Sequence, residues 1–179
     1  MKKLCALALL LSTSAYSQTE TSGPTLPMVK EVHNQEESRM HMGVNFGINN
    51  PEGSRGATPE FGVDLGLQPL IPFGFGVELN TSRFVRSDDE SYKRTSLLAR
   101  GTYNFGGDIP VIRYSYFGLA TGPIFIEEGT RLGIAPLMGF DIPITEDRST
   151  SLGFMTKFLF VTGNAPDSLM TSAALKYWF

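Results

Sequence analysis

From residue 40 to the end of the chain, apolar side chains recur at every second position. In the first such segment, Met42, Val44 and Phe46 alternate with Gly43 and Asn45. A period of two places the two sets on opposite sides of a β-strand. The pattern predicts eight strands, over residues 40–48, 61–67, 73–80, 96–105, 111–122, 131–142, 151–160 and 171–179.

The second set decides which solvent each face meets. It consists mostly of Gly, Ala, Ser, Thr and Asn, which is a poor water-facing surface but fits the interior of a narrow barrel. The large apolar set then faces lipid, where only a closed sheet satisfies every backbone group. We therefore predict an all-β fold, an eight-stranded antiparallel up-and-down transmembrane β-barrel. Its interior would hold a charge network of Asp64, Glu78, Arg100, Arg131, Asp141, Lys157 and Lys176.

The opposite arrangement is a soluble, lipocalin-like barrel whose apolar set points inward. In that case Phe61, Phe75 and Phe140 would line a ligand cavity. The two arrangements share the same alternation, and the poor polarity of the second set favours the membrane barrel.

The predicted connections alternate around the barrel. Residues 68–72 and 106–110 have the composition of tight turns, and 143–149 is slightly longer. On the opposite side, 49–59 and 83–93 are the longest loops. Strand 111–122 has apolar residues on both parities, which indicates a bulge or a change of register.

Two further features belong to the opposite side. The acidic run Asp88, Asp89 and Glu90 lies within loop 83–93 and could bind a divalent cation that bridges to lipopolysaccharide phosphates. Several apolar and aromatic residues are expected to form the aromatic girdle at the membrane interface. The alternative is that they form an apolar outer rim that binds a partner. They are Phe84, Val85, Tyr92, Ile124 and Phe125.

The N-terminal residues predict export. Lys2 and Lys3 precede a short apolar run and small residues, which is the pattern of a secretory signal peptide over residues 1–17. The run is too short to serve readily as a membrane anchor, and Cys5 lies too early to be acylated in a lipoprotein. Residues 18–39 are polar and are predicted to be a flexible periplasmic leader, with an amphipathic clamp over 28–39 as the alternative.

Composition narrows the class of protein. The chain has 179 residues, which suits one domain, and its 18% of charged residues is below the roughly 25% of a soluble protein. The chain has no run of about 18 apolar residues, so a transmembrane helix is not predicted. The formal net charge of −3 argues against a nucleic-acid partner. Cys5 is the only cysteine, so after cleavage disulfides and thiolate chemistry are excluded.

The C-terminal strand carries a family resemblance. Leu175, Tyr177 and the terminal Phe179 resemble the membrane insertion signal of Gram-negative outer-membrane proteins. With the Phe-Gly repeat over 73–76, residues 40–179 resemble the small eight-stranded barrels of the OmpA/OmpX type. The resemblance implies outer-membrane lipid and lipopolysaccharide as surroundings, and the barrel-assembly machinery and periplasmic chaperones as partners. The peptidoglycan-binding domain of larger members is not expected after Phe179.

Enzymatic activity is not expected. Outer-membrane barrels that modify lipid A use a His with a Ser and a carboxylate near the outer leaflet, and this chain has only His33, in the leader, and His41. His41 is predicted to face the lumen at the periplasmic end. No motif for a cofactor or a metal is present. We expect a monomeric, non-enzymatic barrel with a structural or surface-interaction role. The alternative is a narrow channel through the charged lumen, which the many lumen glycines would favour by leaving gaps.

Overall fold

The computed structural model describes residues 38–54, 56–69, 72–85, 91–106 and 109–179. The predicted signal peptide and nearly all of the predicted leader lie outside this part of the chain. In the described part, no helix is long and apolar enough to cross a membrane.

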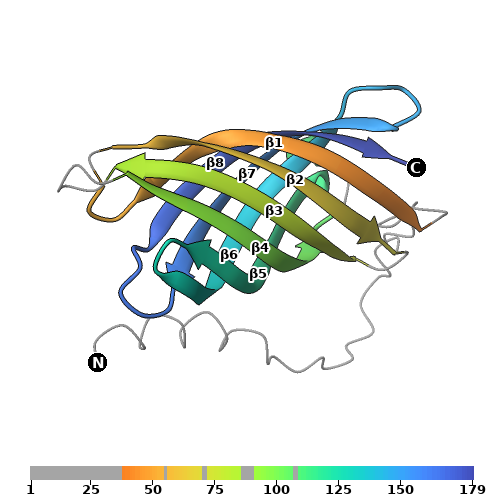
Figure 1. Cartoon of the computed structure of the whole chain (residues 1–179). Helices are drawn as coiled ribbons and strands as arrows, with labels where there is room; N and C mark the ends of the chain where they lie inside the picture. The colour runs from red at the N-terminus through yellow and green to blue at the C-terminus, as the bar shows by residue number, and fades with distance from the viewer. Residues whose placement is uncertain (1–37, 55, 70–71, 86–90, 107–108) are drawn as a thin grey trace, which may run out of the picture. The chain divides into compact units, whose positions relative to one another are not determined.

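The described residues form eight antiparallel strands that close into one barrel (Figure 1). Each strand pairs with its neighbours in sequence, and β1 closes on β8 through the pairing of His41 with Trp178 and of Pro51 with Ser168. The strands are β1 (Arg39–Pro51), β2 (Thr58–Gln68), β3 (Phe73–Val85), β4 (Ser91–Asn104), β5 (Ser115–Ile126), β6 (Gly129–Pro143), β7 (Thr150–Val161) and β8 (Ser168–Trp178). We call the barrel end that holds the start of β1 and the end of β8 the terminal end, and the opposite one the far end.

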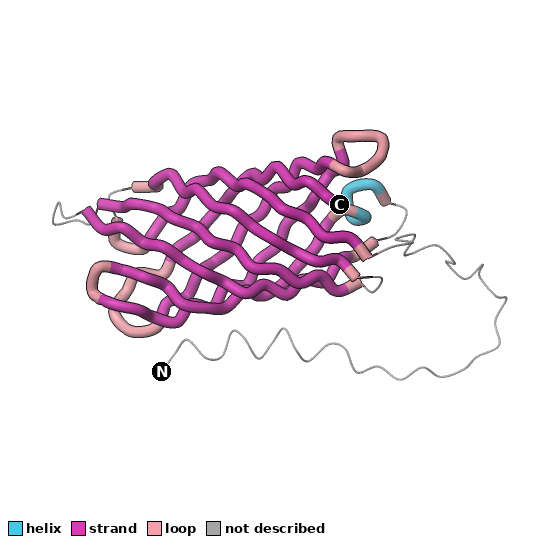
Figure 2. The backbone as a smooth tube through the Cα atoms, turned by 45° about the vertical axis from the view of Figure 1, so that its right-hand side comes forward, coloured by secondary structure: helices cyan, strands magenta, loops and turns pink. Residues whose placement is uncertain are grey.

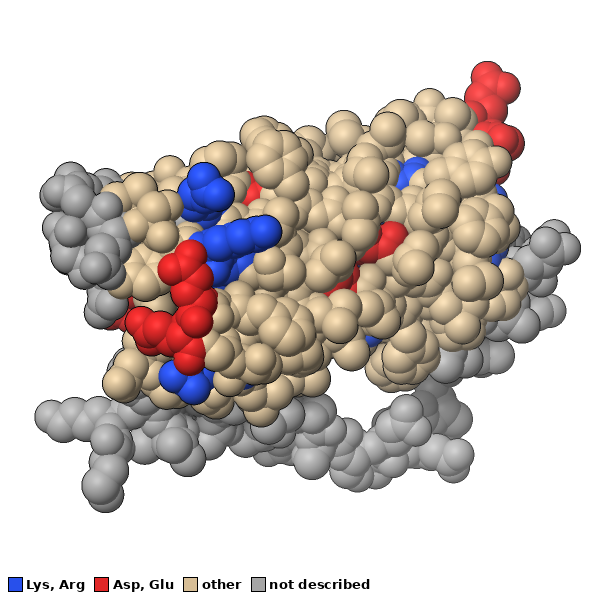
Figure 3. Space-filling view, in the orientation of Figure 1, with Lys and Arg blue, Asp and Glu red and all other residues tan. Residues whose placement is uncertain are grey.

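Burial alternates along the strands, and the large apolar residues lie outside. Val44, Phe46 and Leu65 are each more than half exposed, whereas Asn45 and Asp64 beside them are buried. Phe61 and Phe75 are also more than half exposed, which excludes a lipocalin-like cavity lined by them. The wall is largely uncharged in the space-filling view, and most of its visible charge gathers toward the two ends (Figure 3). The predicted inside-to-outside arrangement is confirmed.

The predicted strand 111–122 begins four residues too early, and the predicted tight turn 106–110 is wrong. The chain instead forms a single helical turn, α1 (Pro110–Arg113), at the end of the barrel that carries the C-terminus (Figure 2). Proline has a backbone angle suited to the first position of a helix, and the amide of Arg113 donates to the carbonyl of Ile109. Because β5 begins only at Ser115, its parity is regular: Tyr116 and Ala120 point inward and Phe117 outward.

The two far-end loops predicted to be longest are shorter than predicted, and the longest connection, 105–114, lies at the terminal end. β1 continues to Pro51 because its last residues still pair with β8, and β3 continues with β4 as far as the pair Val85 and Ser91. The far-end connections are therefore 52–57, 86–90, 127–128 and 162–167, against 69–72, 105–114 and 144–149 at the terminal end. The predicted cation site at 88–90 lies outside the described residues.

The turn between β6 and β7 is held by local hydrogen bonds. The backbone amide and the hydroxyl of Ser149 both donate to Asp147 Oδ1, at 3.1 and 2.9 Å. Together with a hydrogen bond from the side chain of Thr145, these bonds lower the pKa of Asp147 to about 2. The terminal-end turn is therefore built from its own polar side chains.

Aromatic rings gather near the terminal end. Phe73, Phe105 and Phe117 each have ring centroids within 6 Å of Tyr103 on the outer surface. Of the predicted girdle residues, Val85 and Phe125 are exposed, but Ile124 is completely buried inside the barrel. Ile124 therefore does not belong to the girdle, since it shares the inward parity of Tyr116 and Ala120.

Candidate functional site in the barrel interior

A chain of ionisable side chains crosses the lumen. We call His41, Asp64, Arg100, Glu78 and Lys157 the ion chain; each is at most 9% exposed. His41 Nε2 lies 2.9 Å from Asp64 Oδ2, and Arg100 donates to the same oxygen at 3.4 Å. Arg100 also approaches Glu78 Oε2 at 3.7 Å, and Lys157 donates to Glu78 Oε1. Four strands, β1 to β4, are thereby tied to β7.

A second pair lies near the terminal end. Lys176 on β8 donates to Asp141 Oδ2 on β6 at 2.7 Å, and its ammonium lies 5.4 Å from the centre of the Tyr116 ring. Trp178 covers this region: its indole N–H donates to Ser151 at 2.9 Å, and its ring contacts that of His41 at 4.4 Å between centroids. A small pocket of about 30 Å³ beside these residues has room for about two water molecules.

The interior contains a polar group near the far end that the sequence analysis missed. Asn49 donates to Glu60 at 3.2 Å and to Ser82 at 3.0 Å, and Arg94 donates to the hydroxyl of Ser168 at 2.7 Å. Glu60 has the same strand parity as Asp64, and Arg94 has the same parity as Arg100, so the alternation places both side chains inside. Both were missed because they lie just outside the predicted strands.

Arg131 does not join the ion chain. It lies near the start of β6, toward the far end, and is only partly buried. No ion pair to Arg131 is found within the described ranges, and its Nε has no hydrogen-bond partner there. Six of the seven residues predicted to form the network therefore meet in ion pairs, and Arg131 stands apart.

The lumen glycines do not leave gaps. Gly66 is the cross-strand partner of His41, and a methyl group on Gly66 would overlap the imidazole ring. In the same way, Gly43 accommodates Asp64 and Gly153 accommodates Asp141, which are their register partners. The space that a glycine frees is thus occupied by the charged side chain opposite it.

Part of the lumen is apolar, which the sequence analysis did not predict. Leu98, Ile124 and Leu159 are 0% exposed, and with their neighbours they form what we call the apolar cluster. Its members come from β4 to β8, so it lies on the side of the barrel opposite β1 to β3. The full cluster is Leu98, Tyr116, Ala120, Ile124, Ala135, Leu137, Met155, Leu159, Val161 and Met170.

Charged and apolar side chains together occupy much of the barrel interior. Asp64, Glu78 and Asp141 each form an ion pair with a buried cation. His41 is held between Asp64 and Trp178 at the terminal end of the barrel. An eight-stranded barrel is just wide enough for such side chains to fill its interior.

Comparison with solved structures decides the fold. Neisserial surface protein A is 18% identical, with a TM-score of 0.56, over 79% of this chain and 97% of that one. The chain has the fold of the eight-stranded outer-membrane β-barrels. The predicted fold class and the resemblance to this kind of barrel are confirmed.

Other comparisons are weaker. Two structures of the outer-membrane protein Ail of Yersinia pestis match at a TM-score of 0.49. One, in a phospholipid nanodisc, is 11% identical over 78% of this chain and 99% of that one. The other, in complex with the heparin analogue sucrose octasulfate, is 13% identical over 80% and 99%. No protein-family model matches the chain, and no curated protein matches its sequence.

Proposed function

We propose that this chain is a monomeric, non-enzymatic outer-membrane β-barrel with a closed lumen and a structural or surface-interaction role at its far end. The observation that carries the proposal is the inverted surface: exposed apolar residues surround a barrel whose charges are buried and paired. In this orientation the signal peptide exports the chain, the terminal end faces the periplasm and the far end faces outward. Lipid and lipopolysaccharide surround the wall.

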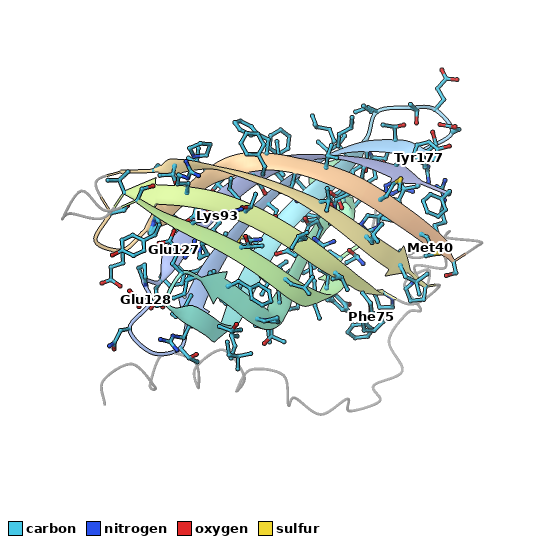
Figure 4. The ribbon with its side chains drawn as sticks, viewed as in Figure 1. Met40, Phe75, Lys93, Glu127, Glu128 and Tyr177 are labelled. Atoms are coloured by element: carbon cyan, nitrogen blue, oxygen red, sulfur yellow. The ribbon has the colours of Figure 1, made fainter. Side chains whose placement is uncertain are left out.

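The C-terminal strand supports assembly in the outer membrane. Leu175, Tyr177 and Phe179 are each about half exposed on the outer wall, where Tyr177 is labelled in Figure 4. Outward apolar residues at the end of the last strand suit recognition by the barrel-assembly machinery, to which periplasmic chaperones would deliver the chain. The proposal assigns no cofactor and no metal.

The first experiment is cell fractionation followed by electrophoresis of the outer-membrane fraction with and without boiling. A stable barrel in that fraction gives a mobility shift on boiling. Recovery of the chain as a soluble periplasmic protein without a shift would overturn the proposal.

A narrow channel is the second candidate, because Arg100 lies between two carboxylates and could exchange one for the other. Planar-bilayer recording separates the two candidates. We expect no discrete conductance from the native chain. Conductance that changes in Arg100→Ala or Glu78→Ala would instead support the channel.

A further inference from the structure

The outer face of the β3–β4 hairpin changes in polarity from one end of the barrel to the other. Starting at the far end, the pair Val85 with Ser91 is followed by a cationic pair, a hydroxyl pair, apolar pairs and finally an aromatic pair. All members have the outward parity of their strands. The cross-strand partners are Arg83 with Lys93, Thr81 with Thr95, Leu79 with Leu97, Val77 with Ala99, Phe75 with Gly101 and Phe73 with Tyr103.

The cationic pair lacks a counter-charge within the described residues. Arg83 and Lys93 are both exposed, and like charges directly opposite each other destabilise a sheet. Glu127 and Glu128 lie at the same end of the barrel as Lys93 (Figure 4) but form no ion pair with it. An anion that bridges the two cations would remove the repulsion.

The next rung down the hairpin is polar but uncharged. The hydroxyls of Thr81 and Thr95 lie 3.4 Å apart on the outer surface. They stand between the cations and the first fully apolar pair, Leu79 and Leu97. Hydroxyls at this level suit the ester or sugar oxygens that join a lipid's phosphate to its acyl chains.

Closer to the terminal end than the hydroxyls, the outward side chains of β4 are small. Ala99 and Gly101 lie between bulky partners, since Gly101 pairs with Phe75 on β3 and with Leu119 on β5. A methyl group on Gly101 would meet no atom within 4 Å, so the space above it is open. A flexible acyl chain would fit along this strand.

We propose that the outer face of β3–β4 binds a phosphorylated lipid of the outward leaflet, of the lipid A class. The phosphate lies between Arg83 and Lys93, the linking oxygens face Thr81 and Thr95, and one acyl chain follows Ala99 and Gly101. Cross-strand side chains are close enough to share one phosphate, and an arginine can donate two bonds to it. The inference rests on the proposed position of the barrel in the outer membrane.

The test uses the refolded chain in phosphatidylcholine nanodiscs with a small fraction of lipid A. Native mass spectrometry measures how much lipid A each variant retains. We expect Arg83→Ser with Lys93→Ser to lower the affinity about tenfold or more, because charge-assisted bonds to phosphate are lost. The matched control is Arg113→Ser with Arg148→Asn, which removes two exposed cations at the terminal end and leaves retention unchanged. Equal retention by native chain and first variant would overturn the proposal.

Two further arms separate the parts of the ligand. Gly101→Phe fills the space proposed for the acyl chain without changing the charge. We expect this variant to retain several-fold less lipid A than the native chain. Displacement of bound lipid A by millimolar inorganic phosphate would overturn the lipid assignment and leave a simple anion site. The nanodisc result is independent of cell fractionation, so loss of lipid binding in a barrel that still fractionates with the outer membrane would refute this inference alone.

Discussion

The ion chain and the apolar cluster fill the same lumen, but they differ in what they require of their neighbours. Glu78 needs Lys157 and Arg100 at particular distances, because a buried charge without a partner is costly. Leu159 needs only well-packed volume, which many apolar side chains supply. The charged side of the barrel is therefore specified pair by pair, and the apolar side by total volume.

Breaking the ion chain has the largest expected effect. Glu78→Gln keeps the shape of the side chain but leaves Lys157 with a neutral partner, and we expect a loss of about 4 kcal/mol in unfolding free energy. Reversible urea unfolding in lipid vesicles measures it. The double variant Glu78→Leu with Lys157→Met should recover most of the loss, since it removes both charges. A single variant as stable as the native chain would contradict the requirement for pairing.

Truncation of a side chain in the apolar cluster should lower the unfolding free energy slightly less. The loss should depend on whether the side chain faces the lumen or the lipid. Leu159→Ala loses transfer energy and leaves a cavity, at about 3 kcal/mol. Leu152→Ala, on the outer face of the same strand, should cost about 2 kcal/mol, because lipid refills the space and only the transfer energy is lost. Urea unfolding of both variants in the same vesicles gives the difference. Equal losses would mean that the interior relaxes around the cavity.

Glycine substitutions give the smallest and sharpest comparison. Gly66→Ala places a methyl group against His41 and should cost about 2 kcal/mol, whereas Gly101→Ala enters open space and should change stability by less than about 0.5 kcal/mol. Fluorescence supplies a local readout, since Trp178 is the chain's only tryptophan and contacts the His41 ring. A changed Trp178 spectrum in Gly101→Ala but not in Gly66→Ala would contradict this assignment.

The strands, their parity and the membrane-facing side could be predicted because alternation is a local property. Asp64 and Glu78 were placed inside for the same reason. The pairing of Glu78 with Lys157 could not be predicted, since it joins β3 to β7 across the lumen and depends on the stagger of the whole barrel.

Other differences have equally physical causes. Leu98 and Ile124 have inward parity but were not recognised as a packed cluster, because composition suggested a small and polar lumen. The composition around Pro110 predicts a tight turn, but a proline also suits the first position of a helix, and the structure has the helix. Arg131 has the inward parity but lies near the start of β6, toward the far end, and is not part of the ion chain.

The ion pairs that cross the lumen have a consequence for assembly. Lys157 and Glu78 are separated by three intervening strands in the sheet, and Lys176 and Asp141 by one. In an unclosed sheet such partners cannot all reach each other, so their charged groups are hydrated and not paired. Sealing the seam between β1 and β8 therefore brings the partners together and dehydrates them in one cooperative event. The pairing of β1 with β8 therefore completes the packing of the whole interior.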